Sequence, residues 1–154
     1  MIINFIIKFG YFGLFLLGLS IAIYQPVAPD FFIIGFSGIG LNAYWAATIA
    51  FIGTVIGAIL GYGVGRWLEK VILIKLIRKW QNRFDRGKVL FRKYGVWAVL
   101  IAAVSPLPLS QISWLAGMSR MSLVKFSLTI CAGLIPRYFG EAIFANQLKD
   151  WLIK

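Results

Sequence analysis

The chain has 154 residues, 60% of them hydrophobic, and a formal net charge of +11 at pH 7. A composition this apolar excludes an ordinary soluble domain and indicates a polytopic membrane protein. The absence of histidine from the sequence excludes histidine-based metal sites, proton shuttles and catalytic triads. Because acidic residues are few and do not cluster, we predict no metal site, no cofactor and no enzyme activity. The positive charge is more typical of a cytoplasmic membrane face near anionic headgroups than of a nucleic-acid-binding protein.

The first predicted element is a membrane span from Ile2 to Tyr24, which is too long for a signal-peptide core and lacks a small-residue cleavage site. Pro26 and Pro29 then interrupt the apolar pattern, because each lacks a backbone donor and disfavours helix in the residue before it. Asp30 follows at the start of a new apolar segment, where a helix N-terminus favours a carboxylate. The stretch is either an external loop capped by Asp30 in water, or a break inside the membrane with Asp30 as a functional residue.

The segment from Phe31 to Leu41 is apolar but only eleven residues long, so a helix over it covers about 16 Å, roughly half the hydrocarbon core. It suits one arm of a re-entrant hairpin. Asn42 to Gly65 is long enough to span, and its glycines recur every four residues, so they lie near one face on which another helix can pack closely. These glycines are Gly53, Gly57, Gly61 and Gly65. Hairpin and helix together form a first unit, residues 24–65.

The centre of the chain, residues 66–93, is strongly basic. It holds ten Lys or Arg against Glu69 and Asp85. By the positive-inside rule this segment is cytoplasmic. Apolar residues alternate with the cations around Lys75, which fits a basic amphipathic helix lying on the inner leaflet and binding anionic headgroups. The alternative is that the charges only set the topology.

The second unit, residues 96–144, begins with a short apolar segment from Val96 to Leu109 that Pro106 and Pro108 break. A second short apolar arm, Leu109 to Met118, follows. Basic residues come directly after it and place this end back on the cytoplasmic side. A segment that leaves the cytoplasm, breaks at two prolines and returns predicts a second re-entrant hairpin.

The last predicted span, Phe126 to Phe144, carries two charges. Arg137 and Glu141 are four residues apart and so lie on one helical face. Ionisable residues are costly inside a membrane, which makes them candidates for a functional site. Arg137 can bind a phosphate through fork-like hydrogen bonds, or pair with Asp30 or Glu141 when no ligand is bound. The alternative is a permanent ion pair that fixes the packing.

A weak internal repeat relates the two units. An offset of 79 residues places Pro29 on Pro108, Gly38 on Gly117 and Gly61 on Gly140. Because the first hairpin enters from outside and the second from inside, the units have opposite orientation. Such inverted repeats are common in secondary transporters, where broken helices meet near the bilayer midplane. We therefore predict one all-α polytopic membrane domain over residues 1–154, with two opposed re-entrant helical hairpins and three to four transmembrane helices.

Several motifs recur together in a known order. They are Gln25-Pro26-Val27-Ala28-Pro29-Asp30, the glycine series ending in Gly65-Arg66, Pro106-Leu107-Pro108 with Gly117-Met118, and Arg137-Tyr138. Over about residues 20–140 this pattern resembles the DedA/VTT (SNARE-associated Golgi protein) superfamily, and most closely its short YqaA-like branch. The resemblance implies two opposed hairpins with transmembrane helices. It also implies lipid translocation: undecaprenyl phosphate recycling and proton-dependent transport in bacterial members, and phospholipid scrambling in eukaryotic relatives.

The chain also departs from the better-studied DedA proteins. They carry an acidic residue before the first proline stretch, where this chain reads Ser20-Ile21-Ala22-Ile23. They also carry two arginines around the second proline motif, near the places where this chain has Ala103 and Leu109. The charged positions that the resemblance transfers are Asp30 and Arg137.

From the residues and the resemblance together we predict a multi-pass protein of the cell (inner) membrane that acts as a flippase or scramblase. Its partners are membrane phospholipids or polyprenyl phosphate, and it binds no nucleic acid. Asp30, Arg137 and Glu141 are predicted to bind the substrate or couple its transport. The alternative, of a different class, is a non-transporting membrane scaffold that forms homo-oligomers through its glycine face.

Overall fold

The computed structural model describes residues 2–23, 30, 33–35, 42–75, 78–105 and 108–152. Every regular element in these ranges is helical, in agreement with the predicted all-α class. The helices are α1 (Ile2–Ser20), α3 (Ala43–Lys75), α4 (Arg78–Val104), α5 (Leu109–Met118) and α6 (Leu123–Leu152). The prolines of the first predicted hairpin, Pro26 and Pro29, lie outside the described residues, as do Pro106 of the second and Gly38 of the proposed repeat.

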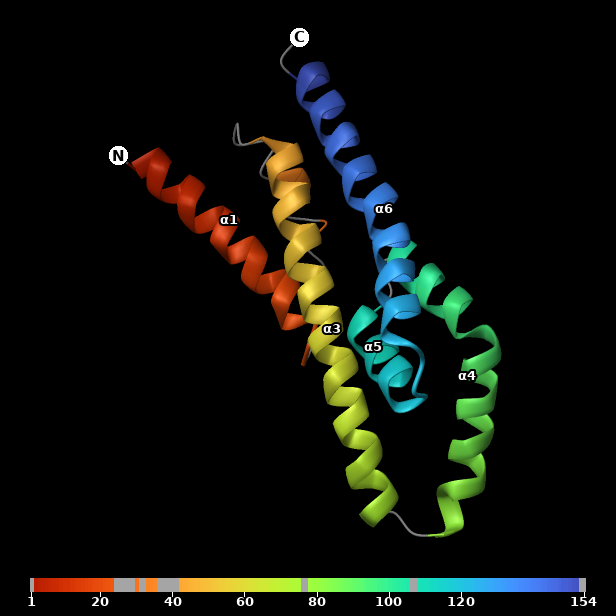
Figure 1. Ribbon diagram of the computed structural model, residues 1–154. Helices are drawn as coiled ribbons and strands as arrows, with labels where there is room; N and C mark the ends of the chain where they lie inside the picture. The colour runs from red at the N-terminus through yellow and green to blue at the C-terminus, as the bar shows by residue number, and fades with distance from the viewer. Residues whose placement is uncertain are drawn as a thin grey trace.

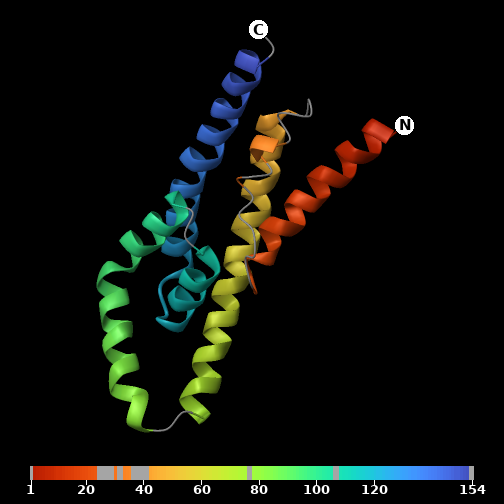
Figure 2. The same cartoon turned by 180° about the vertical axis from the view of Figure 1, so that it is seen from behind.

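Helix α3 is the central element of the molecule. It runs almost the full length of the structure, with α1 on one side and α5 and α6 on the other (Figures 1 and 2). Asn42 caps its start, because the side-chain Oδ1 accepts a hydrogen bond from the backbone N–H of Tyr44 at 2.9 Å. Within the described residues, two helices are long and apolar enough to cross a membrane, Ala43–Lys70 in α3 and Leu123–Leu148 in α6.

The upper half of the glycine row on α3 packs against α1. A Cβ added to Gly53 would lie 2.6 Å from the carbonyl oxygen of Phe15, and one added to Gly57 would lie 2.5 Å from that of Gly18. These distances are too short for any side chain, so the two backbones are in direct contact. Helix α1 diverges from α3 beyond this point, toward its N-terminus (Figure 1).

The lower half of the same row packs against α5. A Cβ on Gly65 would collide with the carbonyl oxygen of Trp114, and one on Gly61 would lie 3.3 Å from the Cβ of Ser113. Gly63, on another face, has nothing within 4 Å. The row is therefore covered within the chain by α1 and α5. This corrects the predicted use of the glycine face for homo-oligomers, because the face assigned to a second copy is already occupied.

The basic centre differs from its predicted form. Instead of one separate amphipathic helix over residues 66–93, α3 continues to Lys75 and α4 begins at Arg78. The reason lies in the sequence: from Arg66 to Arg86 it contains neither glycine nor proline, so nothing ends the helix where the membrane segment ends. The basic segment is thus made of the adjoining ends of two long helices.

Helices α4 and α5 form a broken pair. Helix α4 rises from the basic end and stops at Val104, and α5 runs back toward the same end (Figures 1 and 2). Pro108 lies at the start of α5, where a proline fits because it needs no hydrogen-bond acceptor. The glycines that the repeat matched have unequal surroundings: Gly61 is packed against Ala22 and Ser113, whereas Gly140 has nothing within 4 Å.

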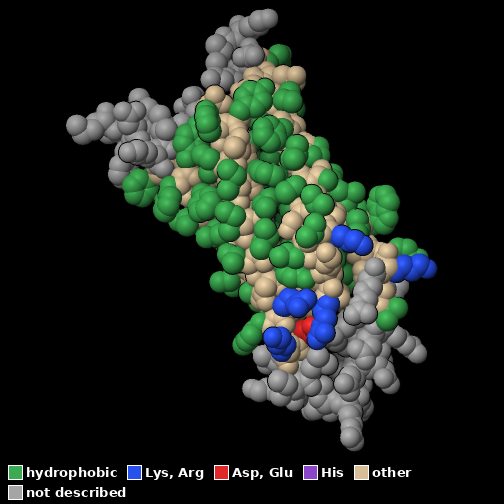
Figure 3. Space-filling model, in the orientation of Figure 1, with side chains coloured by type: hydrophobic (Ala, Val, Ile, Leu, Met, Phe, Trp, Pro, Cys, Tyr) green, Lys and Arg blue, Asp and Glu red, His purple; other side chains and the backbone are tan. Residues whose placement is uncertain are grey.

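The surface separates into apolar flanks and one charged end. Large hydrophobic side chains cover the flank seen in Figure 3, and Lys and Arg side chains gather toward its lower end. Many large apolar residues on the helices are exposed, among them Trp45, Ile56, Trp97 and Leu128. A soluble protein does not expose apolar residues on this scale, whereas a lipid-facing surface does.

Candidate functional site

A largely buried arginine–aspartate pair lies where α6 passes the end of α4. Arg137 of α6 donates hydrogen bonds from Nε to Asp30 Oδ1 and from Nη2 to Asp30 Oδ2, each at 2.7 Å. The two side chains are 8% and 15% exposed. This is the two-pronged geometry in which a guanidinium binds a carboxylate most strongly, and it joins residues 107 positions apart.

The remaining side of Arg137 faces the end of α4. Its Nη1 donates to the carbonyl oxygen of Ser105 at 2.7 Å and more weakly to that of Ala103 at 3.3 Å. The last carbonyls of a helix have no partner within the helix, and its C-terminus favours a positive charge. Arg137 therefore connects three segments: its own helix, the start of the first predicted hairpin and the break in the second.

Glu141 lies one helical turn beyond Arg137. Its Oε1 is 3.7 Å from Nε of Arg137, which is an ion pair too long for a hydrogen bond. Its Oε2 is buried and accepts no hydrogen bond from the described residues. Two carboxylates thus share one guanidinium, and the one from Glu141 retains unused acceptor capacity. No group of three or more Cys, Asp or Glu side chains that could hold a metal ion occurs in the described ranges.

Tyr138 fixes this part of α6 to α3. Its hydroxyl lies 3.0 Å from the Thr54 hydroxyl, and both residues are buried. Its ring centroid is 5.7 Å from the guanidinium carbon of Arg137, within the range of a cation–π contact. Sequence reasoning missed the role of Thr54. Its position could have indicated the contact: Thr54 follows Gly53 in an otherwise apolar span, and a buried hydroxyl there needs a hydrogen-bond partner.

The predicted site residues thus divide into two groups. Asp30, Arg137 and Glu141, which come from distant parts of the chain, form one cluster. Of the residues predicted to break the hairpins, Pro108 is described, and its exposed ring takes no part in this cluster. The carbonyls of Ala103 and Ser105 complete the arginine site, and neither was predicted.

A model of the VTT domain family matches residues 26–147, which include all three charged residues of the cluster. The chain belongs to the VTT domain family. This confirms the resemblance and, with the apolar helices, identifies a membrane protein of the DedA type. Within this family the chain is similar to proteins named as lipid-phosphate transporters, so lipid transport is supported at the level of the family.

Three relatives illustrate the range of names. Undecaprenyl phosphate transporter A of Staphylococcus aureus is 30% identical over 97% of this chain and 79% of its own length. An uncharacterised protein of Methanocaldococcus jannaschii is 29% identical over 97% of this chain and 91% of its own length. An alkaline phosphatase-like protein of Lactococcus lactis is 31% identical over 87% of this chain and 68% of its own length. No solved structure matches the chain.

Proposed function

We propose that this VTT-domain protein moves a lipid with a phosphate headgroup across the cell membrane, and that Arg137 binds the phosphate in place of Asp30. The observation that carries the proposal is the buried two-pronged pair. A phosphate presents two oxygens to a guanidinium in the same way as a carboxylate, so one can replace the other without a new geometry. The transporter names of relatives favour a polyprenyl phosphate as substrate.

The depth of Arg137 supports this role. Lys125 precedes it by twelve positions and Trp151 follows it by fourteen, which correspond to about 18 Å and about 21 Å along the helix. Cations and tryptophans mark membrane interfaces, and the hydrocarbon core is about 30 Å thick. Arg137 is therefore expected near the bilayer midplane, where a crossing headgroup meets its largest barrier.

The unequal partners of Arg137 suggest a sequence of events. The carbonyls of Ala103 and Ser105 belong to the backbone and stay with the guanidinium, whereas the Asp30 side chain can leave. Protonation of Asp30 removes its charge, weakens the pair and opens the guanidinium to a phosphate. Glu141, one turn away and 3.7 Å from the guanidinium, provides a second carboxylate beside the site. Transport coupled to protons follows from this exchange.

The broken pair of α4 and α5 favours a re-entrant hairpin that enters and leaves at the basic end. In this arrangement residues 66–93 are cytoplasmic and contact anionic headgroups of the inner membrane. The first hairpin, within residues 24–65, enters from the opposite side, and residues 96–144 form the inverted counterpart.

Cysteines introduced at Val96 and Arg120 should react with an impermeant reagent from the same side. Reaction from opposite sides would reject the second hairpin.

The proposed function is tested in proteoliposomes that contain phosphatidic acid with a fluorescent acyl chain. An impermeant quencher reports how much of the inner-leaflet pool reaches the outside. We expect the wild type to expose this pool, Arg137→Gln to lose the activity, and the exposed cation variant Lys93→Gln to retain it. Release of inorganic phosphate is followed in parallel, because it would indicate hydrolysis rather than transport.

The double variant Asp30→Asn/Arg137→Gln decides between the substrate site and a structural ion pair. If the double variant is folded and inactive, the pair is needed for transport itself. If it is folded and exposes the inner pool at the wild-type rate, the pair only fixes the packing and the proposal fails.

A further inference from the structure

A second arginine–carboxylate pair lies at the basic end of the molecule. Arg120, in the turn between α5 and α6, donates from Nε to both oxygens of Glu69 on α3, at 3.2 and 3.0 Å. The carboxylate is 3% exposed and the arginine side chain 55%. The Nη groups of Arg120 make no hydrogen bond to any residue that the structure describes. The guanidinium is thus held by one edge, and its forked end is open.

The backbone of Arg120 is unusual. Its φ is 55°, in the left-handed region that glycine adopts most easily and arginine rarely does. The turn is nonetheless firmly fixed, because the backbone N–H groups of Ser119, Arg120 and Met121 all donate to carbonyls at the end of α5. Tyr62 of α3 also donates to the carbonyl of Met121 at 2.5 Å. An arginine where glycine suits the backbone better indicates that its side chain has a role.

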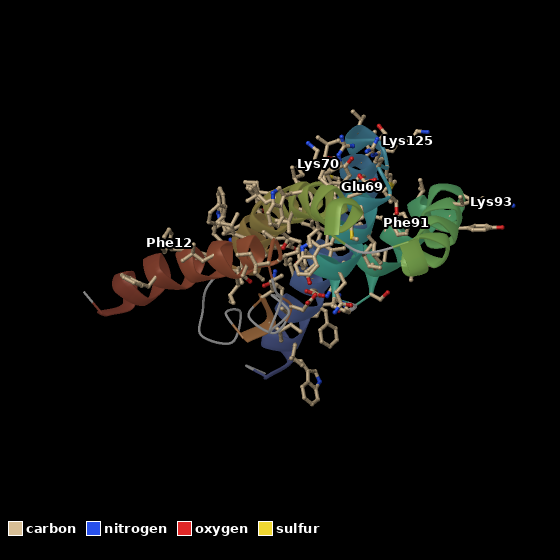
Figure 4. The ribbon with its side chains drawn as sticks, turned by 90° about the horizontal axis from the view of Figure 1, so that it is seen from below. Phe12, Glu69, Lys70, Phe91, Lys93 and Lys125 are labelled. Atoms are coloured by element: carbon tan, nitrogen blue, oxygen red, sulfur yellow. The ribbon has the colours of Figure 1, made fainter. Side chains whose placement is uncertain are left out.

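Other cations surround this pair. Arg66 and Lys70 flank Glu69 on α3, and Lys125 lies in the first turn of α6; all three side chains are exposed. Figure 4 shows Lys70, Glu69 and Lys125 gathered at one edge of the molecule, and Figure 3 shows an acidic side chain among Lys and Arg. Among the described residues one buried carboxylate stands against four cations, which gives this part of the site an excess positive charge.

We propose that Arg120 is the centre of a second anion site, which binds the phosphate of an acidic lipid headgroup at the basic end. The open fork of Arg120 offers two donors to the phosphate oxygens, and Lys70 and Lys125 supply further charge. Trp67, 63% exposed beside Arg66, is the kind of residue that lies at the level of the headgroups, which favours a lipid over a soluble phosphate. This site is separate from the buried pair and does not depend on transport.

Native mass spectrometry of the detergent-solubilised protein tests the site with dihexanoyl phosphatidylglycerol, dihexanoyl phosphatidylcholine and inorganic phosphate. We expect the wild type to bind phosphatidylglycerol about tenfold more tightly than phosphatidylcholine, because the choline cation offsets the phosphate charge and is repelled by the cations around Arg120. Arg120→Gly, which suits the backbone, should abolish this preference, and Arg120→Lys, which keeps the charge without the fork, should reduce it. Lys149→Gln, near the far end of α6 and outside residues 66–93, is the control and should leave it unchanged.

Three results would overturn the proposal. Equal losses in Arg120→Gly and Lys149→Gln would show attraction to net charge rather than a site. Binding of inorganic phosphate as tight as that of phosphatidylglycerol would replace the lipid by a soluble anion. If Arg120→Lys prefers phosphatidylglycerol over phosphatidylcholine as strongly as the wild type does, the forked guanidinium is not used in binding. If Arg120→Gly does not fold, the comparison of Arg120→Lys with the wild type still tests the proposal.

Discussion

The molecule contains two arginine–carboxylate pairs that are buried in opposite ways. In the middle, the Arg137 side chain is 8% exposed, and its donors are taken up by Asp30 and two carbonyls. At the basic end the carboxylate of Glu69 is buried, and Arg120 is open to its surroundings. The same chemistry therefore gives two different sites. An anion reaches Arg137 only by displacing a partner, whereas it can reach Arg120 directly.

The difference also sets what each pair contributes to stability. Removing both charges of Arg137 and Asp30 from water is costly, and their mutual attraction offsets this only while both are present. In the other pair Arg120 is 55% exposed, and Glu69 keeps the flanking cations Arg66 and Lys70 on α3 when Arg120 is replaced, so its charge is not left alone. Such a half-exposed ion pair contributes about 1 kcal/mol or less. Substitutions that break the Arg137 pair should therefore lower the free energy of unfolding more than substitutions that break the Arg120 pair.

The largest effect is expected from Arg137→Gln. Leaving Asp30 buried without its partner should lower the free energy of unfolding by about 3–5 kcal/mol, whereas Arg120→Gln should lower it by about 1 kcal/mol. Adding Asp30→Asn to Arg137→Gln removes the unpaired charge and should restore most of the loss. Thermal unfolding in detergent, read from tryptophan fluorescence, measures all four proteins under the same conditions.

Equal destabilisation by the two single arginine variants would contradict this comparison, because it would mean that burial does not distinguish the pairs. Failure of Asp30→Asn to restore stability would show that the carbonyls of Ala103 and Ser105, rather than the carboxylate, dominate the environment of Arg137. Lys93→Gln, which changes an exposed cation on α4, is the control for loss of positive charge alone.

Sequence reasoning found the charged residues of the central site but not its full composition. Asp30, Arg137 and Glu141 were evident because a charge in an apolar segment is costly and therefore informative. The carbonyls that complete the site were not, since every residue carries a carbonyl and only the break after Val104 frees these. The pairing of Asp30 with Arg137 was one of several open alternatives, because spacing along the chain does not specify contacts over 107 positions.

The basic end was harder to predict for a related reason. Arg120 was interpreted only as a signal of topology, because its left-handed backbone and its contact with Glu69 depend on how α5 packs against α3. The close approach of those helices was predictable from the glycine row, but the partner that covers it was not. The helical ends of the basic segment were misjudged because charge indicates the side of the membrane and not the end of a helix.

The smallest effects, and the sharpest separation of the two sites, are expected from two tyrosines. The Tyr138 hydroxyl interacts with Thr54 beside Arg137, and the Tyr62 hydroxyl donates to the carbonyl of Met121 beside Arg120. Tyr138→Phe and Tyr62→Phe each remove one hydrogen bond at no cost in ring packing, so each should lower the free energy of unfolding by about 1 kcal/mol. Stability alone therefore does not distinguish them.

Function should distinguish them. Tyr138→Phe releases α6 from α3 next to Arg137, so we expect slower lipid translocation in proteoliposomes with phosphatidylglycerol binding unchanged. Tyr62→Phe loosens the turn that holds Arg120, so we expect weaker phosphatidylglycerol binding with translocation unchanged. Adding Thr54→Val to Tyr138→Phe removes the buried hydroxyl left without a partner and should recover stability but not transport. If either tyrosine variant affects both assays equally, the two arginine sites are coupled through α3 and cannot be treated as independent.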